Sequence, residues 1–243
     1  MRVRAVLFDL GGTLIDHKDF DGWTEVARRF FLDFEPDQLR HAFFEVEEEL
    51  DAHPPSPPGE AALVEFWHRT LSRAAGKDVD EATTLKFHAA VWNAHPTVRL
   101  YSDTRRCLDT LRGEHRALGV VSNSRSEAGV RRILDQVGIL DHFSCIVSSG
   151  TEGIEKPDPE IFRRALMRMD VPAAEAVYVG NLAHTDALAA TAVGMHGVWL
   201  NREGFGFGVD PPEITSLLEV PLVVRRLEDG GAPSQGRVAG GAR

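Results

Sequence analysis

The segment at residues 3–10 constrains the fold of this chain more than any other feature. It is a short apolar run with β-branched and aromatic side chains, and two glycines, Gly11 and Gly12, end it. Such a run is typical of a strand that is buried on both faces of a parallel sheet. Four more strand-like runs follow, separated by helical segments: residues 117–121, 144–147, 176–179 and 197–200. Because alternating helices and strands build a parallel sheet covered on both faces, the pattern predicts an α/β fold.

Residues 17–95 interrupt this alternation with helices alone. Apolar side chains recur there at spacings of three and four, which is typical of helices that bury one face. The pattern predicts four helices, near residues 23–31, 39–50, 63–71 and 85–92. The second and third are separated by residues 53–59, a proline-rich stretch that no helix can cross. We expect the aromatic side chains of this region to pack in a core: Trp23, Phe30, Phe31, Phe43, Phe44, Phe66, Trp67 and Trp92.

The sequence therefore predicts three parts. A Rossmann-like parallel sheet in three α/β/α layers comprises residues 1–16 and 96–227, and an all-helical domain at residues 17–95 is inserted into it. Residues 228–243 are rich in Gly and Ala with few apolar anchors, which predicts a disordered tail. The length of 243 residues suits a core domain with a smaller one inserted.

Composition and charge narrow the classes of function. The formal net charge of -10 argues against binding to a nucleic-acid backbone, which requires clustered Lys and Arg. Cys107 and Cys145 stand in apolar surroundings, which predicts buried free thiols in a reducing compartment. We expect no signal peptide, since Met1 leads directly into a strand, and no apolar stretch reaches the ~18 residues of a membrane span. The sequence thus predicts a cytoplasmic protein that binds neither nucleic acid nor a membrane, and it leaves the oligomeric state open.

Polar side chains stand where three of the predicted strands end. Asp9 ends the first, Ser122 follows the second, and Asn181 follows the fourth, with Asp186 shortly after it. Lys156 lies between Ser122 and Asn181 along the chain. In an open parallel sheet, ligands bind beyond the carboxyl ends of the strands. If these ends are neighbours, one pocket holds two carboxylates, a hydroxyl and a cation.

Each of these residues also has a structural interpretation. Asp9 could cap a loop, and Ser122 with Asn123 could begin the next helix as an N-cap. Residues 157–160 form an ordinary helix start, with proline and acidic side chains in the first turn. Lys156 is the most informative, because a cation at a helix N-terminus opposes the helix dipole. An anionic substrate would explain why a lysine stands there.

Four short motifs occur in order along the chain. They are Asp9-Leu10-Gly11-Gly12-Thr13-Leu14, Ser122-Asn123, Lys156-Pro157-Asp158-Pro159, and Gly180-Asn181 followed by Asp186. This set resembles the motifs of the haloacid dehalogenase (HAD) superfamily of hydrolases, of the subfamily I type that carries a helical cap between motifs one and two. The resemblance covers nearly the whole chain, and it implies that residues 17–95 are the cap.

The resemblance implies a role for each matched residue. Asp9 would attack phosphorus as a nucleophile, Ser122 would hydrogen-bond the phosphoryl oxygens, and Lys156 would neutralise their charge. The substrate would be a small phosphorylated metabolite. Further roles follow from the motifs: Gly12, Thr13 and Asn123 in substrate binding, and Asp9, the carbonyl of Gly11, Asp186 and Asn181 in Mg²⁺ binding.

Two positions depart from the phosphatases of the superfamily. Gly11 stands where they carry an aspartate that protonates the leaving group, and Asn181 stands where they carry the first acidic residue of motif four. Loss of general acid/base help costs about 10²–10⁴ in rate, and loss of a carboxylate weakens metal binding. The candidates for a substitute proton donor are His17, His184 and Asp16, or a group of the substrate itself.

The sequence accordingly predicts a hydrolase with an aspartate nucleophile and Mg²⁺-dependent, phosphatase-like activity. Two alternatives stay open. One is a catalytically weak or silent protein of the same fold that binds a phosphorylated ligand or a partner. The other is cleavage of a C–X or C–P bond. A phosphonate-cleaving enzyme needs a cap lysine, and Lys18, Lys77 and Lys86 are available.

Overall fold

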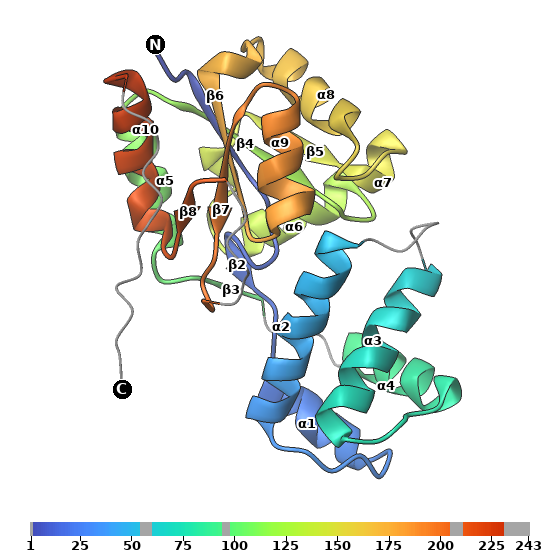
Figure 1. Ribbon diagram of the computed structural model, residues 1–243. Helices are drawn as coiled ribbons and strands as arrows, with labels where there is room; N and C mark the ends of the chain where they lie inside the picture. Colours follow the sequence, from blue (N-terminus) through green and yellow to red (C-terminus); the bar gives the residue numbers. More distant parts are fainter. Residues whose placement is uncertain (1, 54–59, 94–97, 205–210, 231–243) are drawn as a thin grey trace. The chain divides into compact units, whose positions relative to one another are not determined.

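The computed structural model describes residues 2–53, 60–93, 98–204 and 211–230 (Figure 1). The chain forms two compact units. The larger comprises Met1–Asp16 and Val98–Arg243, and the smaller is the helical insertion His17–Thr97. None of the described helices is long and apolar enough to cross a membrane.

The larger unit is built on a parallel sheet of six strands within the described part of the chain. Their order across the sheet is β5-β4-β1-β6-β7-β8. Their bounds are β1 Ala5–Phe8, β4 Ala117–Ser122, β5 Cys145–Ser148, β6 Ala176–Gly180, β7 His196–Leu200 and β8 Glu213–Ile214. A short antiparallel pair, β2 (Ile15–Asp16) with β3 (Arg99–Leu100), stands where the chain leaves and re-enters this unit. The predicted α/β fold with a parallel sheet is confirmed.

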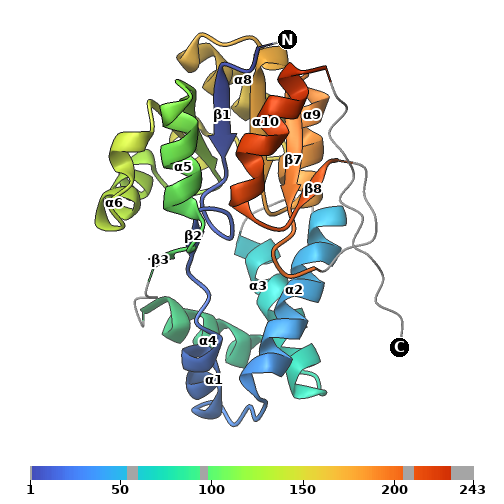
Figure 2. The ribbon, with the colours of Figure 1, turned by 90° about the vertical axis from the view of Figure 1, so that its left-hand side faces the viewer.

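Helices cover both faces of the sheet. Helices α5, α6 and α10 pack on one face and α8 and α9 on the other, and Figure 2 shows α5 and α10 in front of the strands. The bounds of the helices are α5 Thr104–Gly113, α6 Glu127–Gln136, α7 Ser149–Glu152, α8 Pro159–Met169, α9 Ala189–Ala192 and α10 Val220–Glu228. Shorter turns of helix are 3₁₀ at Leu140–His142, Ala173–Glu175 and Leu217–Glu219, and π-helical in η3 at Ala183–Leu188.

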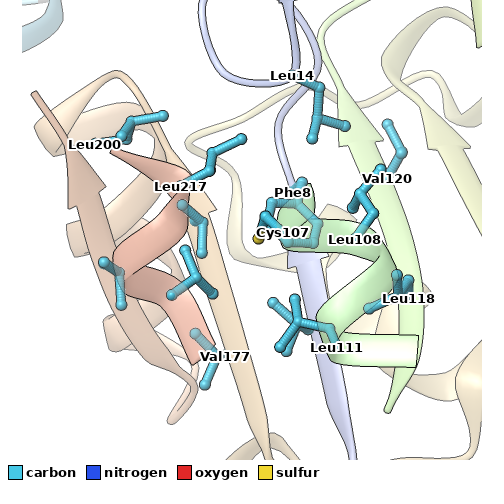
Figure 3. Packing of buried hydrophobic residues seen from close by; sticks show 14 of the residues in the cluster. Phe8, Leu14, Cys107, Leu108, Leu111, Leu118, Val120, Val177, Leu200 and Leu217 are labelled. Carbon is cyan, nitrogen blue, oxygen red and sulfur yellow. The ribbon is translucent and has the colours of Figure 1, made fainter. Parts of the chain in front are cut away.

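Successive side chains of β1 enter two different apolar cores. Phe8 packs in the core that also holds Leu108 and Leu111 of α5 (Figure 3). Leu7 packs in the opposite core with Phe162 of α8. Because side chains alternate between the faces of a strand and both faces are buried here, every position of β1 must be apolar. This is the physical reason for the continuous apolar run Ala5–Phe8.

Both cysteines, Cys107 and Cys145, are buried and free, as their apolar surroundings predicted. Burial raises the pKa of the Cys107 thiol to about 12. Since the thiolate is the reactive form of cysteine, Cys107 is chemically inert at neutral pH and serves as a small apolar core residue.

The end of the larger unit is more ordered than the sequence analysis predicted. β8 and α10, which follow β7, were not predicted, and α10 ends at Glu228. The carboxylate of Glu228 accepts hydrogen bonds from Arg116 and from the backbone N–H of Val3. The predicted disordered tail is therefore wrong at residues 228–230, because α10 packs its apolar face on the sheet. Residues 231–243 of that prediction lie outside the described residues.

The smaller unit contains four helices in its described part: α1 Phe20–Arg28, α2 Pro36–Ala52, α3 Glu60–Ala75 and α4 Glu81–Asn93. Its core is aromatic. The ring centroids of Phe43 and Phe66 lie 4.9 Å apart and those of Trp23 and Trp67 lie 5.3 Å apart, both edge to face. The predicted aromatic core is present, and the side chain of Trp92 lies outside the described residues.

The aromatic side chain of Phe31 lies outside the core of the smaller unit. Phe31 was predicted to pack in the core, but it is 91% exposed. The reason is local: α1 ends at Arg28, and Phe31 turns the chain with a φ of 57° in the left-handed region.

Of the three lysines considered for a cap role, Lys18 is buried, with its Nζ 4.8 Å from the ring centroid of Phe44, whereas Lys77 and Lys86 are exposed.

Candidate active site

Three strand ends lie side by side at the carboxyl edge of the sheet. β1 lies between β4 and β6, and Phe8 at its end is in register with Val120 and Val179. The backbone N–H of Asp9 donates to the carbonyl of Val179 at 2.9 Å, which fixes Asp9 just beyond the strand. Ser122 is the last residue of the neighbouring β4. The structure therefore brings together strand ends that are far apart in sequence, at the edge where ligands of parallel sheets bind.

The ammonium group of Lys156 joins the two carboxylates of this edge. Its Nζ donates to Asp9 Oδ1 at 2.7 Å and to Asp186 Oδ1 at 2.6 Å, and it lies 3.1 Å from the hydroxyl oxygen of Tyr178. All four residues are buried. Charge-assisted hydrogen bonds of this length are strong, because the low dielectric of a buried site does not screen them. Two carboxylates share one ammonium, so the cluster has a formal charge of −1.

The backbone of Lys156 is held by Asn123, which follows β4. Asn123 Oδ1 accepts from the backbone N–H of Lys156 at 2.8 Å, and Asn123 Nδ2 donates to the Lys156 carbonyl at 2.9 Å. Helix α8 begins only at Pro159, with Asp158 as its N-cap. Lys156 therefore lies in the loop before the helix, and the opposition to the helix dipole that the sequence suggested is weak. What fixes this lysine is the double hydrogen bond from Asn123.

Asp186 lies in the π-helical segment η3 and is fully buried. Its Oδ2 accepts from the backbone N–H of Leu182 at 3.0 Å, while its Oδ1 faces Lys156. The close approach of Asp186 to the end of β6 requires Gly180, because a Cβ at position 180 would lie 2.2 Å from the Asp186 carboxyl carbon. Both oxygens of Asp186 are thus engaged by the protein itself.

Tyr178 is a member of this cluster that the sequence analysis missed. Its hydroxyl lies 3.0 Å from the carbonyl oxygen of Val121 and 3.3 Å from Asp186 Oδ1, in addition to its contact with Lys156. The ring packs edge to face on Phe162, with centroids 5.0 Å apart. The signal in the sequence was a single phenol in an otherwise aliphatic strand, two residues before the glycine that ends it.

Burial and the neighbouring charges together set the pKa values of the cluster. Burial alone would lower the pKa of the Lys156 ammonium, but the charges of Asp186 and Asp9 outweigh it and raise this pKa well above its ordinary value. Burial raises the pKa of the Asp186 carboxyl, and the attraction of Lys156 opposes that shift. Burial also raises the pKa of the Tyr178 phenol well above its ordinary value. Near neutral pH, Lys156 is a permanent cation and Tyr178 is a neutral hydrogen-bonding group.

Asn181 packs against the first motif. Its Oδ1 accepts from the buried hydroxyl of Thr13 at 3.3 Å, and its backbone carbonyl accepts from the indole N–H of Trp199 at 3.0 Å. Gly12 has a φ of 77°, and a Cβ there would lie 2.8 Å from the amide of Asn181. Only glycine fits this close approach. Gly12, Thr13 and Asn181 thus form one contact between the loop after β1 and the end of β6.

The remaining predicted residues are placed as follows. The hydroxyl of Ser122 is 2.6 Å from that of Ser124. Asp16 lies in β2 and forms an ion pair with Arg99 at 3.5 Å. His184 lies in η3, two residues before Asp186, and His17 belongs to the smaller unit.

The sequence of the chain matches a known family. The family model described as haloacid dehalogenase-like hydrolase matches residues 3–194. The chain belongs to this family of HAD hydrolases. The predicted superfamily is thereby confirmed, and so is the assignment of the chain as a HAD-type hydrolase.

Relatives and solved structures agree with this assignment. The chain is 39% identical over 134 residues to "Haloacid dehalogenase-like hydrolase domain-containing protein 3" of Danio rerio, which covers 54% of each protein, so the match spans about half of that relative. It is 27% identical over 205 residues to the glyceraldehyde 3-phosphate phosphatase of Pyrococcus abyssi, covering 81% of each. The crystal structure of a HAD phosphatase from Thermococcus onnurineus superposes with a TM-score of 0.57 at 25% identity, covering 96% of this chain and 100% of that one.

The residues of this HAD hydrolase offer a small donor set to a metal ion. Within the described residues, no group of three or more His, Cys, Asp and Glu side chains could hold one. Among the residues that the structure describes, the Asp186 side chain accepts hydrogen bonds on both oxygens and the Asp9 side chain accepts one on Oδ1; a carboxylate oxygen that accepts one hydrogen bond can still bind a metal ion. The oxygens that could bind a metal ion here are those of Asp9 and Asp186, the Asn181 amide oxygen, which also accepts from Thr13, and the Gly11 carbonyl. Mg²⁺ binds well to one or two carboxylates together with water and substrate oxygens, so this set fits Mg²⁺. Its affinity should be lower than that of a set with a carboxylate at position 181.

Proposed function

We propose that this chain is a phosphatase that hydrolyses a small phosphorylated metabolite, with Asp9 as the nucleophile. The observation that carries the proposal is the sharing of Lys156 between Asp9 and Asp186. Lys156 binds one oxygen of Asp9 and leaves Oδ2 without a hydrogen bond from the described residues. A buried, oriented carboxylate with one open oxygen beside a fixed cation is the arrangement that attack on a phosphoryl group requires.

The reaction proceeds in two steps. Asp9 Oδ2 attacks phosphorus, the bond from phosphorus to the leaving oxygen breaks, and an aspartyl phosphate forms. Water then attacks this intermediate, releases inorganic phosphate and restores the Asp9 carboxylate. Carboxylate and phosphoryl group are both negative and repel each other, so the permanent charge of Lys156 lowers the cost of their approach. The Ser122 hydroxyl, next to Asp9 at the sheet edge, would donate to a phosphoryl oxygen.

Mg²⁺ is proposed as the cofactor, held by Asp9, the Gly11 carbonyl, Asp186 and Asn181. When bound, it supplies positive charge that neutralises the phosphoryl oxygens. Because position 181 carries a neutral amide instead of a carboxylate, we expect weak binding. Asn181→Asp keeps the side-chain shape and adds a charge, so this variant should bind Mg²⁺ more tightly in a calorimetric titration.

Gly11 restricts the substrate. It has no side chain that could protonate the leaving oxygen, so a phosphate ester of a simple alcohol, which is a poor leaving group, is expected to react slowly. An acyl phosphate or an aryl phosphate needs little protonation and is expected to react faster.

The resemblance of the four motifs to those of the HAD superfamily supports the further proposal that the helical unit is the cap domain. The cytoplasmic location stays a prediction.

The deciding experiment is an assay of p-nitrophenyl phosphate hydrolysis with and without Mg²⁺. The native chain is compared with Asp9→Asn and with Asp135→Asn, a matched control on the exposed surface of α6. We expect turnover in the native chain and in Asp135→Asn, and none above background in Asp9→Asn.

Two other results would select the alternatives. Absence of turnover in the native chain at every Mg²⁺ concentration would reject the phosphatase and favour a silent protein that binds a phosphorylated ligand. Chloride release from a 2-haloacid without metal would identify a dehalogenase, in which the same carboxylate attacks carbon. The absence of a proton donor at Gly11 is the observation that keeps this second reaction open.

A further inference from the structure

A buried ion pair outside the catalytic cluster contacts the first motif. Arg202 stands two residues after β7, and Asp103 stands immediately before α5. The guanidinium of Arg202 donates to both oxygens of Asp103, each at 2.9 Å, and its Nη2 also donates to the backbone carbonyl of Thr13 at 2.9 Å. This set of three residues is called the Thr13 clamp below.

The Thr13 clamp is rigid by construction. The side chains of Arg202 and Asp103 are only 14% and 8% exposed. The guanidinium also stacks on the ring of Tyr101, with its central carbon 3.9 Å from the ring centroid. Asp103 Oδ2 accepts two further hydrogen bonds, from the hydroxyl of Ser216 at 2.7 Å and from the N–H of Leu217 at 2.9 Å. Together these contacts hold the planar guanidinium of Arg202 in a single orientation.

The carbonyl that the clamp holds belongs to the loop that follows Asp9. On one side of this loop, the Thr13 hydroxyl contacts Asn181. On the other side, the Thr13 carbonyl is held by Arg202, and the next carbonyl, that of Leu14, accepts from the hydroxyl of Thr104 at 2.8 Å. Two glycines lie between Asp9 and these anchors, and glycine imposes little conformational preference of its own. The loop also closes on itself, since the N–H of Gly12 donates to the Ile15 carbonyl and that of Leu14 to the Leu10 carbonyl, each at 2.9 Å, so the anchors at Thr13 and Leu14 set the position of this turn as a unit.

We propose that Arg202 is a positioning residue for the nucleophile. By fixing the Thr13 carbonyl, it sets the path of residues 10–13, and with it the direction of the Asp9 carboxylate and of the Gly11 carbonyl. Arg202 touches no reacting atom, and it acts through the main chain of the loop. The inference rests on the proposed function of Asp9, but the clamp itself can be tested without any activity.

The chain contains a matched control at the other end of the same strand. Arg116 donates to both oxygens of Glu228, at 2.7 and 2.8 Å, and its Nη1 also donates to the backbone carbonyl of Val3, just before β1. The Arg116 side chain is 11% exposed. The construction is the same, an arginine that forks onto a carboxylate and holds one carbonyl, but the held carbonyl is at the amino end of β1, away from Asp9.

The experiment compares Arg202→Lys with Arg116→Lys in the full chain. Lysine keeps the charge but cannot bind a carboxylate with two parallel bonds and a carbonyl at once. We expect both variants to lose thermal stability. Only Arg202→Lys should lower kcat for p-nitrophenyl phosphate, by about tenfold or more because a small misplacement of a reacting group is costly. KM should change less than kcat, and inhibition by orthovanadate should weaken in parallel.

Hydrogen–deuterium exchange gives the readout that does not depend on catalysis. Backbone amides at residues 10–14 should exchange faster in Arg202→Lys and at the native rate in Arg116→Lys. Unchanged exchange at these residues in Arg202→Lys, or equal losses of kcat in the two variants, overturns the proposal. If Arg202→Lys does not fold, Asp103→Asn replaces it, since loss of the carboxylate frees the guanidinium with little change in shape. If the native chain hydrolyses no phosphate ester, the proposed function fails, and the exchange measurement still decides the clamp.

Discussion

The two ends of β1 carry charged groups that are arranged in different ways, partly exposed at the amino end and buried at the carboxyl end. At the amino end, one arginine meets one carboxylate, Arg116 with Glu228, and both hold the backbone of Val3. At the carboxyl end, Lys156 is shared by Asp9 and Asp186. The first group is neutral, and the second has a formal excess of one negative charge.

This difference distinguishes a structural ion pair from the cluster that we propose to be catalytic. A balanced pair satisfies its own hydrogen bonds and closes an edge of the fold, as a structural ion pair does. An unbalanced cluster costs desolvation energy that no internal partner repays, and such clusters concentrate at functional sites. The structure supports the second cluster with the hydroxyl of Tyr178 and the N–H of Leu182. In the proposed function, the excess negative charge attracts a cation, and the open Oδ2 of Asp9 attacks the substrate.

The largest expected effect comes from removal of the shared cation. Lys156→Met leaves two buried carboxylates without their counter-ion, and we expect the free energy of unfolding to fall by about 3–5 kcal/mol. The rate of phosphate hydrolysis should fall by about 10²–10³ for the molecules that remain folded. Urea denaturation and the p-nitrophenyl phosphate assay measure the two effects. Arg116→Met, the control at the other end of β1, should lose stability and keep kcat; equal loss of kcat in both variants would erase the difference between the ends.

The next effect tests the missing proton donor at the carboxyl end. Gly11→Asp should raise kcat/KM for alkyl phosphates by about 10–10², because it restores general acid catalysis, and should change the rate for aryl phosphates little. Gly12, not Gly11, has a positive φ, so the backbone conformation at position 11 is one that other residues also adopt. Gly11→Asn is the control of equal size without an acidic proton. An equal gain in both variants would assign the effect to packing.

A smaller effect is expected from the support of Lys156. Tyr178→Phe keeps the ring on Phe162 and removes one hydroxyl that faces Lys156 and the Val121 carbonyl. We expect a loss of about 1 kcal/mol in the free energy of unfolding. The value of kcat should fall several-fold, since the ammonium gains freedom between the two carboxylates. Native kinetics in a variant with the expected loss of stability would reduce Tyr178 to a core residue.

The smallest effect concerns the pH dependence of stability. It should be similar for Asp103, in the Thr13 clamp, and for Glu228, at the amino end of β1. Burial alone would raise the pKa of Asp103, but hydrogen bonds from Arg202 and Ser216 outweigh it and lower this pKa. Hydrogen bonds from Arg116 lower the pKa of Glu228. A carboxyl group whose pKa is depressed by folding stabilises the protein above its unfolded value, about 4, and this contribution is lost as the pH falls through the folded value.

Native stability should therefore decline as the pH falls below about 4. Asp103→Asn and Glu228→Gln should each show a shallower decline, because the group that takes up the proton on unfolding is gone. Urea midpoints measured between pH 6 and pH 3 test this. A decline as steep as that of the native chain in either variant would contradict the pKa shift assigned to that carboxyl.

Much of this protein could be predicted from its sequence, because local patterns encode it. The apolar run before Asp9 required a strand buried on both faces, and the helical spacing of residues 17–95 required helices that bury an aromatic stripe. The motifs at Asp9, Ser122, Lys156 and Asp186 predicted which side chains would be neighbours, because the carboxyl ends of parallel strands share one edge. Two losses, at Gly11 and Asn181, were equally visible, and they shape the proposed chemistry.

The partners of these side chains were decided by the tertiary structure alone. Lys156 and Asp9 are 147 residues apart, Arg202 and Thr13 are 189 apart, and no local pattern records such contacts. The sequence assigned Asn123 to the substrate, and the fold adds hydrogen bonds between its amide and the backbone of Lys156. It likewise offered Asp186 to a metal, and the fold adds hydrogen bonds from Lys156 and Leu182 to its two oxygens. Periodicity and motifs fix which residues stand at the edge of the sheet. Only close packing fixes which of their atoms remain open, because each buried polar atom takes the partner that the folded chain brings within reach.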